Sequence, residues 1–183
     1  VSAARRVLEA TGVAFDWDVQ EAGADVMDKH GTPLPEAVLE SIRGNGVALK
    51  GPITTPVGTG FRSVNVAIRK VLNLYANVRP ARTLRGIPRA RPDVDIVVVR
   101  ENTEGLYCGI GGFLKKNSPD EVATQTLVNT RKGVERCIRY AFEYARKRDR
   151  EKKVTLCDKS NVLTYAHDLW QRVFHEVGEE YPD

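Results

Sequence analysis

The sequence predicts an α/β fold, and three observations support this class. Residues 94–99 (VDIVVV) form a nearly continuous apolar run, which is typical of a strand buried on both faces. Residues 130–148 carry a stripe of apolar side chains at helical spacing. Strand-like and helix-like segments alternate along the rest of the chain, and this alternation indicates α/β architecture.

The first part of the chain contains helices and short strands. Apolar residues three or four positions apart indicate a helix, whereas strict alternation indicates a strand. A proline favours the first turn of a helix and a glycine its end. We expect a helix over 2–11, a strand over 14–19, a helix from Pro35 to Gly44, a strand over 47–49, and a helix that has Ser63 as its N-cap.

The second part of the sequence predicts a similar succession of strands and helices, interrupted by a proline-rich loop. A strand over 74–78 should stop at Arg79 and Pro80, and glycine-containing strand-like pieces at 107–129 indicate a protruding hairpin. In order, we expect strand 74–78, loop 82–93, strand 94–99, hairpin 107–129, helix 130–148, strand 153–157 and helix 161–177.

Length and composition are those of an ordinary globular protein. The chain has 183 residues, 42% of them hydrophobic and 28% charged, enough for one domain or parts of two. No apolar run approaches the ~20 residues of a membrane span, and no signal peptide is visible. The chain lacks a first Met, and both ends look cut. We therefore expect an internal part of a cytoplasmic protein, although a missing start leaves organellar targeting open.

Charge and cysteine content narrow the function classes. The net charge is +4, and five arginines fall within residues 79–91, so a nucleic-acid-binding α/β module is an alternative. This loop has no interleaved aromatic residues for base stacking, which favours a solvated loop and no nucleic-acid partner. The three cysteines form no CxxC pair and the three histidines have no ligand spacing. We expect reduced structural thiols and no metal bound by these residues.

Basic and polar side chains gather at two places where an anion could bind. Ser63, Asn65 and Arg69 lie at one end and on one face of a predicted helix, where free N–H groups and the helix dipole favour a carboxylate. An N-cap with a solvated helix face explains the same pattern. Arg79 and Arg100 each follow a predicted strand, and guanidinium groups bind carboxylates in a bidentate manner. Together these residues suit a ligand with two or three carboxylates.

Two longer stretches carry a resemblance to a known family. GPITTPVGTGFRSVNVAIRKVLNLYANVRP and VVVRENTEGLYCGI resemble the substrate-binding region of the isocitrate/isopropylmalate/homoisocitrate dehydrogenases, which are β-decarboxylating enzymes. The similarity extends from DKHGTPLPEAVLESIR to VTLCDKSNVL. It implies that residues 1–74 are part of a large α/β domain and that residues 75–183 form most of a smaller one. A dimerisation arm would protrude at 107–129.

The resemblance implies specific substrate contacts. The residues that match the family's carboxylate-binding positions are Ser63, Asn65, Arg69, Arg79 and Arg100. In bacterial isocitrate enzymes the serine that matches Ser63 can be phosphorylated, which would place a repulsive dianion at the substrate carboxylate.

Catalytic and cofactor roles also follow from the resemblance. Tyr107 matches the tyrosine that protonates the enolate after carbon dioxide leaves, and Lys159 matches the lysine that helps take the substrate hydroxyl proton. Thr54 and Asn161 match positions near the cofactor. Taken without the resemblance, Tyr107 is a packing residue at a hairpin base and Lys159 a surface lysine.

The family uses a nicotinamide cofactor and a divalent metal ion. The resemblance favours NAD over NADP and implies Mg²⁺ or Mn²⁺. No pair of carboxylates here has the context of a metal site, so we expect the metal ligands outside this chain and no catalysis by these 183 residues alone. A homodimer with shared active sites is expected, in which Lys159 reaches the partner's site.

Among the family's branches, the NAD-linked isocitrate enzymes are the closest match. The polar Ser63 and Asn65 lie where the isopropylmalate branch has apolar side chains, which favours oxidative decarboxylation of isocitrate to 2-oxoglutarate. Homoisocitrate stays open, because one methylene group is worth only about 1–3 kcal/mol in a pocket. Asp158, just before Lys159, is more typical of the isopropylmalate branch and keeps 3-isopropylmalate open as well.

Overall fold

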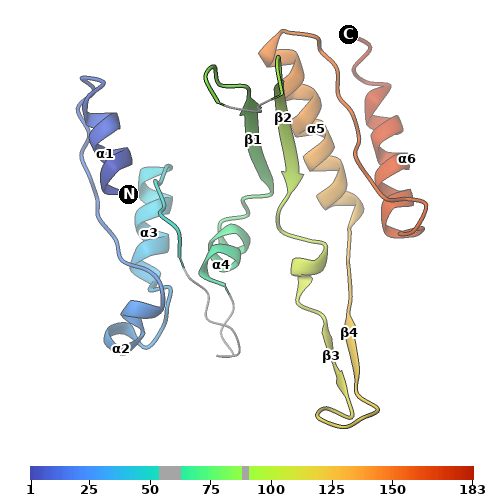
Figure 1. The fold of residues 1–183 in the computed structure, drawn as a ribbon, viewed down its shortest axis with the longest axis horizontal. Helices are drawn as coiled ribbons and strands as arrows, with labels where there is room; N and C mark the ends of the chain where they lie inside the picture. Colours follow the sequence, from blue (N-terminus) through green and yellow to red (C-terminus); the bar gives the residue numbers. More distant parts are fainter. Residues whose placement is uncertain (54–62, 88–90) are drawn as a thin grey trace. The chain divides into compact units, whose positions relative to one another are not determined.

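The chain folds as two compact units, Val1–Leu72 and Asn73–Asp183. The computed structural model describes residues 1–53, 63–87 and 91–183 (Figure 1). Helices and β-strands combine as the sequence predicted, and the α/β class is confirmed. The division lies close to the expected boundary after residue 74, while the assignment of the units to a large and a small domain stays a prediction. No helix in the described part of the chain is long and apolar enough to cross a membrane.

Helices build the first unit. Its core forms between two of them, where Leu39, Val64 and Ile68 are buried against partly buried neighbours such as Ile42 and Ile53. The helix predicted after Ser63 is confirmed, as is the helix that starts after Pro35. The elements are α1 (Ser2–Glu9), the 3-10 turn η1 (Ala24–Val26), α2 (Met27–His30), α3 (Glu36–Asn45) and α4 (Val64–Val71).

The two strands predicted in the first unit do not form. In the described residues, 14–19 and 47–49 pair with no other segment, and the only ladders lie in the second unit. Phe15 instead stacks on Trp17, with ring centroids 5.2 Å apart, and the Arg5 guanidinium lies 5.0 Å from the Trp17 ring. A strand needs a neighbour that accepts and donates its backbone hydrogen bonds. Sequence alternation alone does not supply that neighbour.

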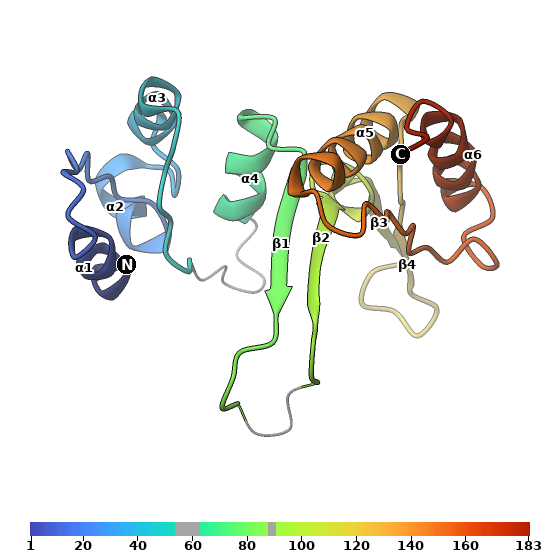
Figure 2. The same cartoon turned by 90° about the horizontal axis from the view of Figure 1, so that it is seen from above.

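The second unit has two antiparallel strand pairs and two long helices. Its elements are β1 (Ala76–Arg82), β2 (Asp95–Glu101), the 3-10 turn η2 (Leu106–Cys108), β3 (Gly111–Leu114), β4 (Val122–Gln125), α5 (Arg131–Arg148) and α6 (Ala166–Gly178). β1 pairs with β2, and β3 pairs with β4. Figure 2 shows α5 and α6 side by side.

The core of the second unit lies between α5 and α6. Val134, Ile138, Val173 and Val177 are almost fully buried there. Burying a branched aliphatic side chain contributes about 1.5–3 kcal/mol, so this cluster is the main apolar contribution to the unit. Thr130 caps α5 by accepting a hydrogen bond of 3.0 Å from the Gly133 N–H, as expected for a helix that begins at this threonine.

Strand β2 is covered on one face only, which corrects the expectation of burial on both. Along β2, exposed residues alternate with partly buried ones, and Ile96, Val98 and Arg100 form the exposed set. α5 packs against β2. An ion pair joins Arg148, at the C-terminal end of α5, to Asp95, which is one of the partly buried residues of β2. Among the described residues, one face of β2 is therefore left exposed.

Strand β1 continues through Arg79 and Pro80, which were wrongly expected to stop it. Pro80 pairs in register with Val97. A proline is tolerated in an edge strand, because the missing N–H is needed only where a second neighbour lies alongside. In the described part of the chain, β2 is the only neighbour of β1. This extension keeps Arg79 inside the strand rather than beyond its end.

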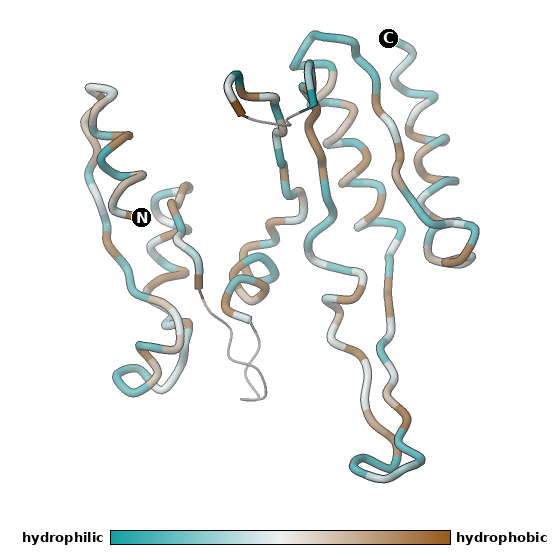
Figure 3. Tube along the Cα trace, in the orientation of Figure 1, coloured by the Kyte–Doolittle hydropathy of each residue, from teal (hydrophilic) through white to brown (hydrophobic). Residues whose placement is uncertain are grey.

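The hairpin predicted at 107–129 is present as β3 and β4. All residues of both strands are exposed, including Phe113, Leu114 and Val122. In Figure 3 the hydrophobic part of the hairpin lies next to a hydrophilic tip. A role for the hairpin as a dimerisation arm stays a prediction.

Two further expectations in the second unit were wrong. The segment 153–157 forms no strand, because it pairs with no other segment in the described part of the chain. The last helix begins at Ala166 instead of residue 161, because the chain first makes a tight turn in which the Val162 and Leu163 N–H groups both donate to the Lys159 carbonyl.

Candidate active site

The register of β1 and β2 gathers polar side chains on the free face of the sheet. Asn77 pairs with Arg100, and Arg79 pairs with Val98. Paired residues point to the same face, as do residues two apart on one strand. Asn77, Arg79 and Arg100 therefore share this face, and Arg79 Nε donates to Asn77 Oδ1 over 3.3 Å. Sequence reasoning missed Asn77, although its place two residues before Arg79 on a strand was a usable signal.

Tyr107 completes this group through Arg100. Nη2 of Arg100 donates a hydrogen bond of 2.7 Å to the Tyr107 hydroxyl, and the guanidinium carbon lies 5.5 Å from the centre of the Tyr107 ring. Arginine can only donate, so the phenol acts as acceptor and its own proton stays available for another group. The structure thus brings together two predicted substrate contacts and the predicted proton donor.

Arg79 and Arg100 form no ion pair with any residue in the described ranges, whereas α5 has four arginines that do: Arg131, Arg139, Arg146 and Arg148. Arg139, for example, binds both carboxylate oxygens of Glu180, at 2.6 and 2.7 Å. Two exposed guanidinium groups on one face, held by Asn77 and Tyr107 rather than by acids, create a local excess of positive charge. Such a surface suits an anion with more than one carboxylate.

In the first unit, α4 holds the other predicted substrate contacts. Ser63 precedes the helix without a capping hydrogen bond from its side chain, and Asn65 Oδ1 is buried without a partner among the described residues. The pKa of Lys50 lies below its ordinary value, first because partial burial disfavours the ammonium and second because Arg69 adds a like charge. Lys50 was missed from the sequence, although a lysine directly before the Gly/Pro loop is visible there.

Lys159 and Asn161 lie in the turn before α6. The Lys159 backbone N–H donates to His167 Nδ1 over 2.7 Å, and the side chains of both residues are exposed. Among the described residues, no hydrogen bond or ion pair joins either side chain to Arg100 or Tyr107. Thr54, the other predicted cofactor contact, lies outside the described residues. The roles of these three residues stay predictions.

Asp158 has a local structural role beside Lys159. Burial raises the pKa of its carboxyl group, but hydrogen bonds from the Ser160 N–H and hydroxyl, both 3.2 Å, outweigh burial and hold the pKa below its usual range. Residues 1–53, 63–87 and 91–183 contain no cluster of three or more His, Cys, Asp or Glu that could hold a metal ion. The described residues therefore do not by themselves fit a divalent metal.

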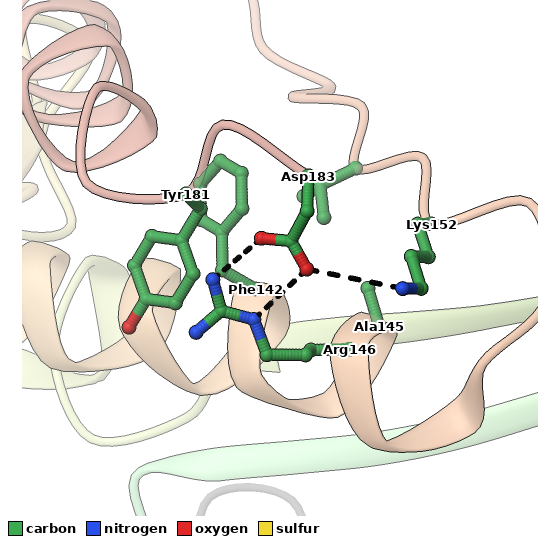
Figure 4. Close-up of a pocket in the computed structure, with 7 residues that line it drawn as sticks. Phe142, Ala145, Arg146, Lys152, Tyr181 and Asp183 are labelled. Carbon is green, nitrogen blue, oxygen red and sulfur yellow. Dashed lines mark hydrogen bonds and ion pairs between the residues drawn. The ribbon is translucent and has the colours of Figure 1, made fainter.

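A shallow pocket elsewhere in the second unit contains none of the predicted site residues (Figure 4). The Asp183 carboxylate closes it by pairing with Arg146 at 2.5 Å and with Lys152 at 3.9 Å. The pocket is lined by Phe142, Ala145, Arg146, Lys152, Val154, Tyr181 and Asp183. Its polar groups satisfy one another, which favours a structural role.

Comparison with known proteins places these features in a family. The family model described as isocitrate/isopropylmalate dehydrogenase matches residues 1–183. The 3-isopropylmalate dehydrogenase of Bifidobacterium longum is 46% identical over 98% of this chain and 54% of its own length. The NADP isocitrate dehydrogenase of Thermus thermophilus is 43% identical over the whole chain and 36% of its own length. The chain thus spans about half the length, or less, of these curated relatives.

Solved structures agree with this assignment. The isocitrate dehydrogenase of Methylococcus capsulatus is 54% identical, with a TM-score of 0.92 over 100% of this chain and 53% of that one. The TT0538 protein of Thermus thermophilus is 42% identical, with a TM-score of 0.87 over 99% of this chain and 36% of that one. The family match over every residue and these likenesses lead to one conclusion: the chain belongs to the isocitrate/isopropylmalate dehydrogenase family.

Proposed function

We propose that the protein that carries this chain oxidises and decarboxylates a 2-hydroxy acid with two or three carboxylates, and that isocitrate is the first candidate. The hydrogen bond from Arg100 to Tyr107, on the face that also carries Arg79, is the observation that supports this most. It sets a carboxylate-binding cation beside a proton donor. A decarboxylation that ends in protonation of carbon needs both.

In the proposed reaction, the chain's own residues bind the substrate and move protons. Arg79 and Arg100 hold substrate carboxylates by charge-assisted hydrogen bonds. Once the 2-hydroxyl has been oxidised to a carbonyl, with its hydride passing to the nicotinamide and its proton to Lys159, the bond to the departing carboxylate breaks. Carbon dioxide leaves, and the electron pair moves into the carbonyl to give an enolate. Tyr107 then donates its hydroxyl proton to the enolate carbon. We propose that NAD, with NADP as the alternative, accepts the hydride, and that the Mg²⁺ or Mn²⁺ ligands lie outside this chain.

The identity of the substrate depends on α4. Ser63 and Asn65 give this helix a polar end, and the buried Asn65 oxygen, which has no partner among the described residues, suits a ligand hydrogen bond. This favours a third carboxylate, as in isocitrate. 3-Isopropylmalate is the second candidate, because several similar curated relatives carry that name at 41–46% identity. Homoisocitrate is the third. A nucleic-acid-binding role has only the arginines of residues 79–91 in its favour.

We further propose that Lys159 and Asn161 act in a homodimer with shared sites. Lys159 would take the substrate hydroxyl proton in the partner's site, and Asn161 and Thr54 would contact the cofactor. The exposed Lys159 side chain forms no ion pair among the described residues, so it is available for such a contact. The exposed apolar residues of β3 and β4 give the hairpin a surface for a second copy.

A nicotinamide-reduction assay tests the proposal. The full-length protein is offered isocitrate, 3-isopropylmalate and homoisocitrate, each with Mg²⁺ or Mn²⁺ and with NAD or NADP. We expect turnover with isocitrate at least about tenfold above the others, since one extra charge-assisted contact is worth about 1.5–3 kcal/mol. Preference for 3-isopropylmalate would replace isocitrate by the second candidate. No turnover with any of the three by the metal-loaded protein would refute the reaction class.

A further inference from the structure

Glu104 fastens the root of the β3–β4 hairpin to the start of α5. Its Oε2 accepts a hydrogen bond of 2.8 Å from the Thr130 N–H, and its Oε1 accepts one of 2.6 Å from the Thr130 hydroxyl. Strand β2 ends at Glu101, and the chain enters the hairpin directly after Glu104 and returns from it directly before Thr130. One side chain therefore joins the two ends of this excursion, 26 residues apart in sequence.

The first turn of α5 is shaped to receive this carboxylate. Gly133 lies beneath it, and a Cβ at this position would overlap the Glu104 carboxylate. The Thr130 hydroxyl that donates to Glu104 also accepts the Gly133 N–H at 3.0 Å. Negative charge at a helix N-terminus is stabilised by the helix dipole and by free N–H groups. The missing side chain at Gly133 and the cap at Thr130 both suit an acid at position 104.

A second set of contacts fixes the loop that leads to Glu104. Glu101, at the end of β2, accepts hydrogen bonds of 2.8 Å from the Thr103 and Glu104 N–H groups. The Thr103 hydroxyl in turn accepts one of 2.8 Å from Arg136 on α5. The loop between β2 and the hairpin is thus bound to α5 at two points, Thr103 and Glu104.

Tyr107 lies three residues beyond Glu104, inside the same turn. Its N–H donates to the Glu104 carbonyl over 3.3 Å, while Gly105 and Val128 exchange backbone hydrogen bonds of 2.7 and 3.3 Å across the hairpin root. From this turn the Tyr107 side chain reaches back to Arg100. The contact between the Tyr107 phenol and the Arg100 guanidinium depends on the path of the chain between these two residues. Glu104 holds the part of this path next to Tyr107 against the start of α5.

We propose that Glu104 is a positioning residue for the reaction: by binding Thr130 it holds the hairpin root so that Tyr107 stays against Arg100. This inference rests on the proposed function for the role of Tyr107, whereas the anchoring of the root does not. Glu104 touches neither Tyr107's hydroxyl nor the Arg100 guanidinium, so it acts through the backbone of the turn. Thr130 and Gly133, at the start of α5, form the site that binds the Glu104 carboxylate.

Three variants of the full-length protein test it. Glu104→Ala removes both contacts. Glu104→Gln can keep both, because its carbonyl oxygen accepts the Thr130 N–H and its amide donates to the Thr130 hydroxyl. Gly133→Ala leaves Glu104 in place but pushes its carboxylate away. Glu121→Ala is the matched control, since this carboxylate also accepts a backbone N–H, that of Asn117 at 2.9 Å, but at the far tip of the hairpin.

Amide hydrogen exchange of residues 104–110 measures the anchoring without reference to activity. We expect faster exchange in Glu104→Ala and Gly133→Ala, near wild-type exchange in Glu104→Gln, and no change at 104–110 in Glu121→Ala. Unchanged exchange in Glu104→Ala would overturn the proposal, whatever the protein's activity. If Glu104→Ala exchanges faster than wild type but the wild-type protein shows no turnover, the proposed function is contradicted and the anchoring role of Glu104 is still supported.

Kinetics at a temperature where all variants are folded measure the positioning. We expect kcat/KM to fall by up to about 100-fold in Glu104→Ala, the scale of a 1 Å misplacement near the chemistry. Glu104→Gln should restore most of it. In a Tyr107→Phe background the same Glu104→Ala change should cost almost nothing more. An equal fold-loss in both backgrounds, or no loss despite faster exchange, would overturn the positioning role.

Discussion

Arg100 donates a hydrogen bond of 2.7 Å to the hydroxyl of Tyr107, and these two residues join the end of strand β2 to the root of the β3–β4 hairpin. The guanidinium is a fixed positive charge, and the phenol keeps its proton free. In the proposed reaction, substrate binding and proton donation would therefore fall to two adjacent side chains. Loss of the phenol and loss of the guanidinium should therefore have different kinetic effects, the first on kcat and the second on KM.

Tyr107→Phe should lower kcat by at least about 100-fold with a small change in KM, because general acid catalysis contributes about 10²–10⁴-fold and the ring still packs on Arg100. Arg100→Gln should raise KM by about 10–100-fold through loss of a charge-assisted bond of about 1.5–3 kcal/mol. Steady-state kinetics of the full-length protein with its best substrate check both. If Tyr107→Phe changes only KM, the phenol binds substrate and does not deliver the proton.

A shared active site predicts complementation between two inactive variants. Lys159→Ala in one subunit and Arg100→Gln in the other leave one site of a mixed dimer intact, because each site takes these residues from different subunits. After denaturation and joint refolding, random pairing should restore about a quarter of wild-type activity. The same variants refolded separately are the control. Activity that stays at the level of the separate variants would mean that each subunit carries its own complete site.

Ion pairs between α5 and the end of the chain should make the second unit sensitive to acid. Arg139 binds Glu180 through two hydrogen bonds and holds the pKa of that carboxyl below its ordinary value of 4.5. A lowered pKa adds stability above the ordinary value, and this stability is lost as the pH falls through the folded-state pKa. Arg139→Gln should therefore unfold more easily at pH 7, and its difference from wild type should shrink below about pH 4.

Urea unfolding followed by circular dichroism at several pH values measures this effect. Arg172→Gln is the control, because Arg172 pairs with Asp168 one turn away on α6, and an exposed pair within one helix contributes little. A constant difference between Arg139→Gln and wild type from pH 7 to pH 3 would show that lost packing, not the ion pair, causes the destabilisation.

Cys137 should be inert to thiol reagents in the folded protein. Burial raises its pKa to about 12, with Glu101 adding to the shift, so thiolate is almost absent at pH 8. Because the neutral thiol is the form that the fold favours, stability should fall as the pH rises above the ordinary value of 9.0. Maleimide labelling with mass spectrometry should modify exposed Cys157 first. Equal labelling of both cysteines under native conditions would contradict the burial of Cys137.

Local sequence signals were sufficient for the helices. The apolar stripe and Thr130 predicted α5 within one residue of its start, and Ser63 marked the start of α4, because helix hydrogen bonds and caps join residues close in sequence. The strands were harder. The segments 14–19 and 153–157 alternate as strands do but lack a neighbour here, and β1 runs on through Pro80 because only one of its edges is paired.

For the site, residue types in the sequence determined the candidates, and their number and chemistry indicated a ligand with several carboxylates. The sequence by itself also determined the family, through motifs such as RENTEGLY that stay in order along the chain. Only the tertiary structure decided that Asn77, Arg79 and Arg100 share one face and that Tyr107 returns to Arg100. Strand register and the contact of Glu104 with Thr130 join residues far apart in sequence, and no local pattern specifies such pairings.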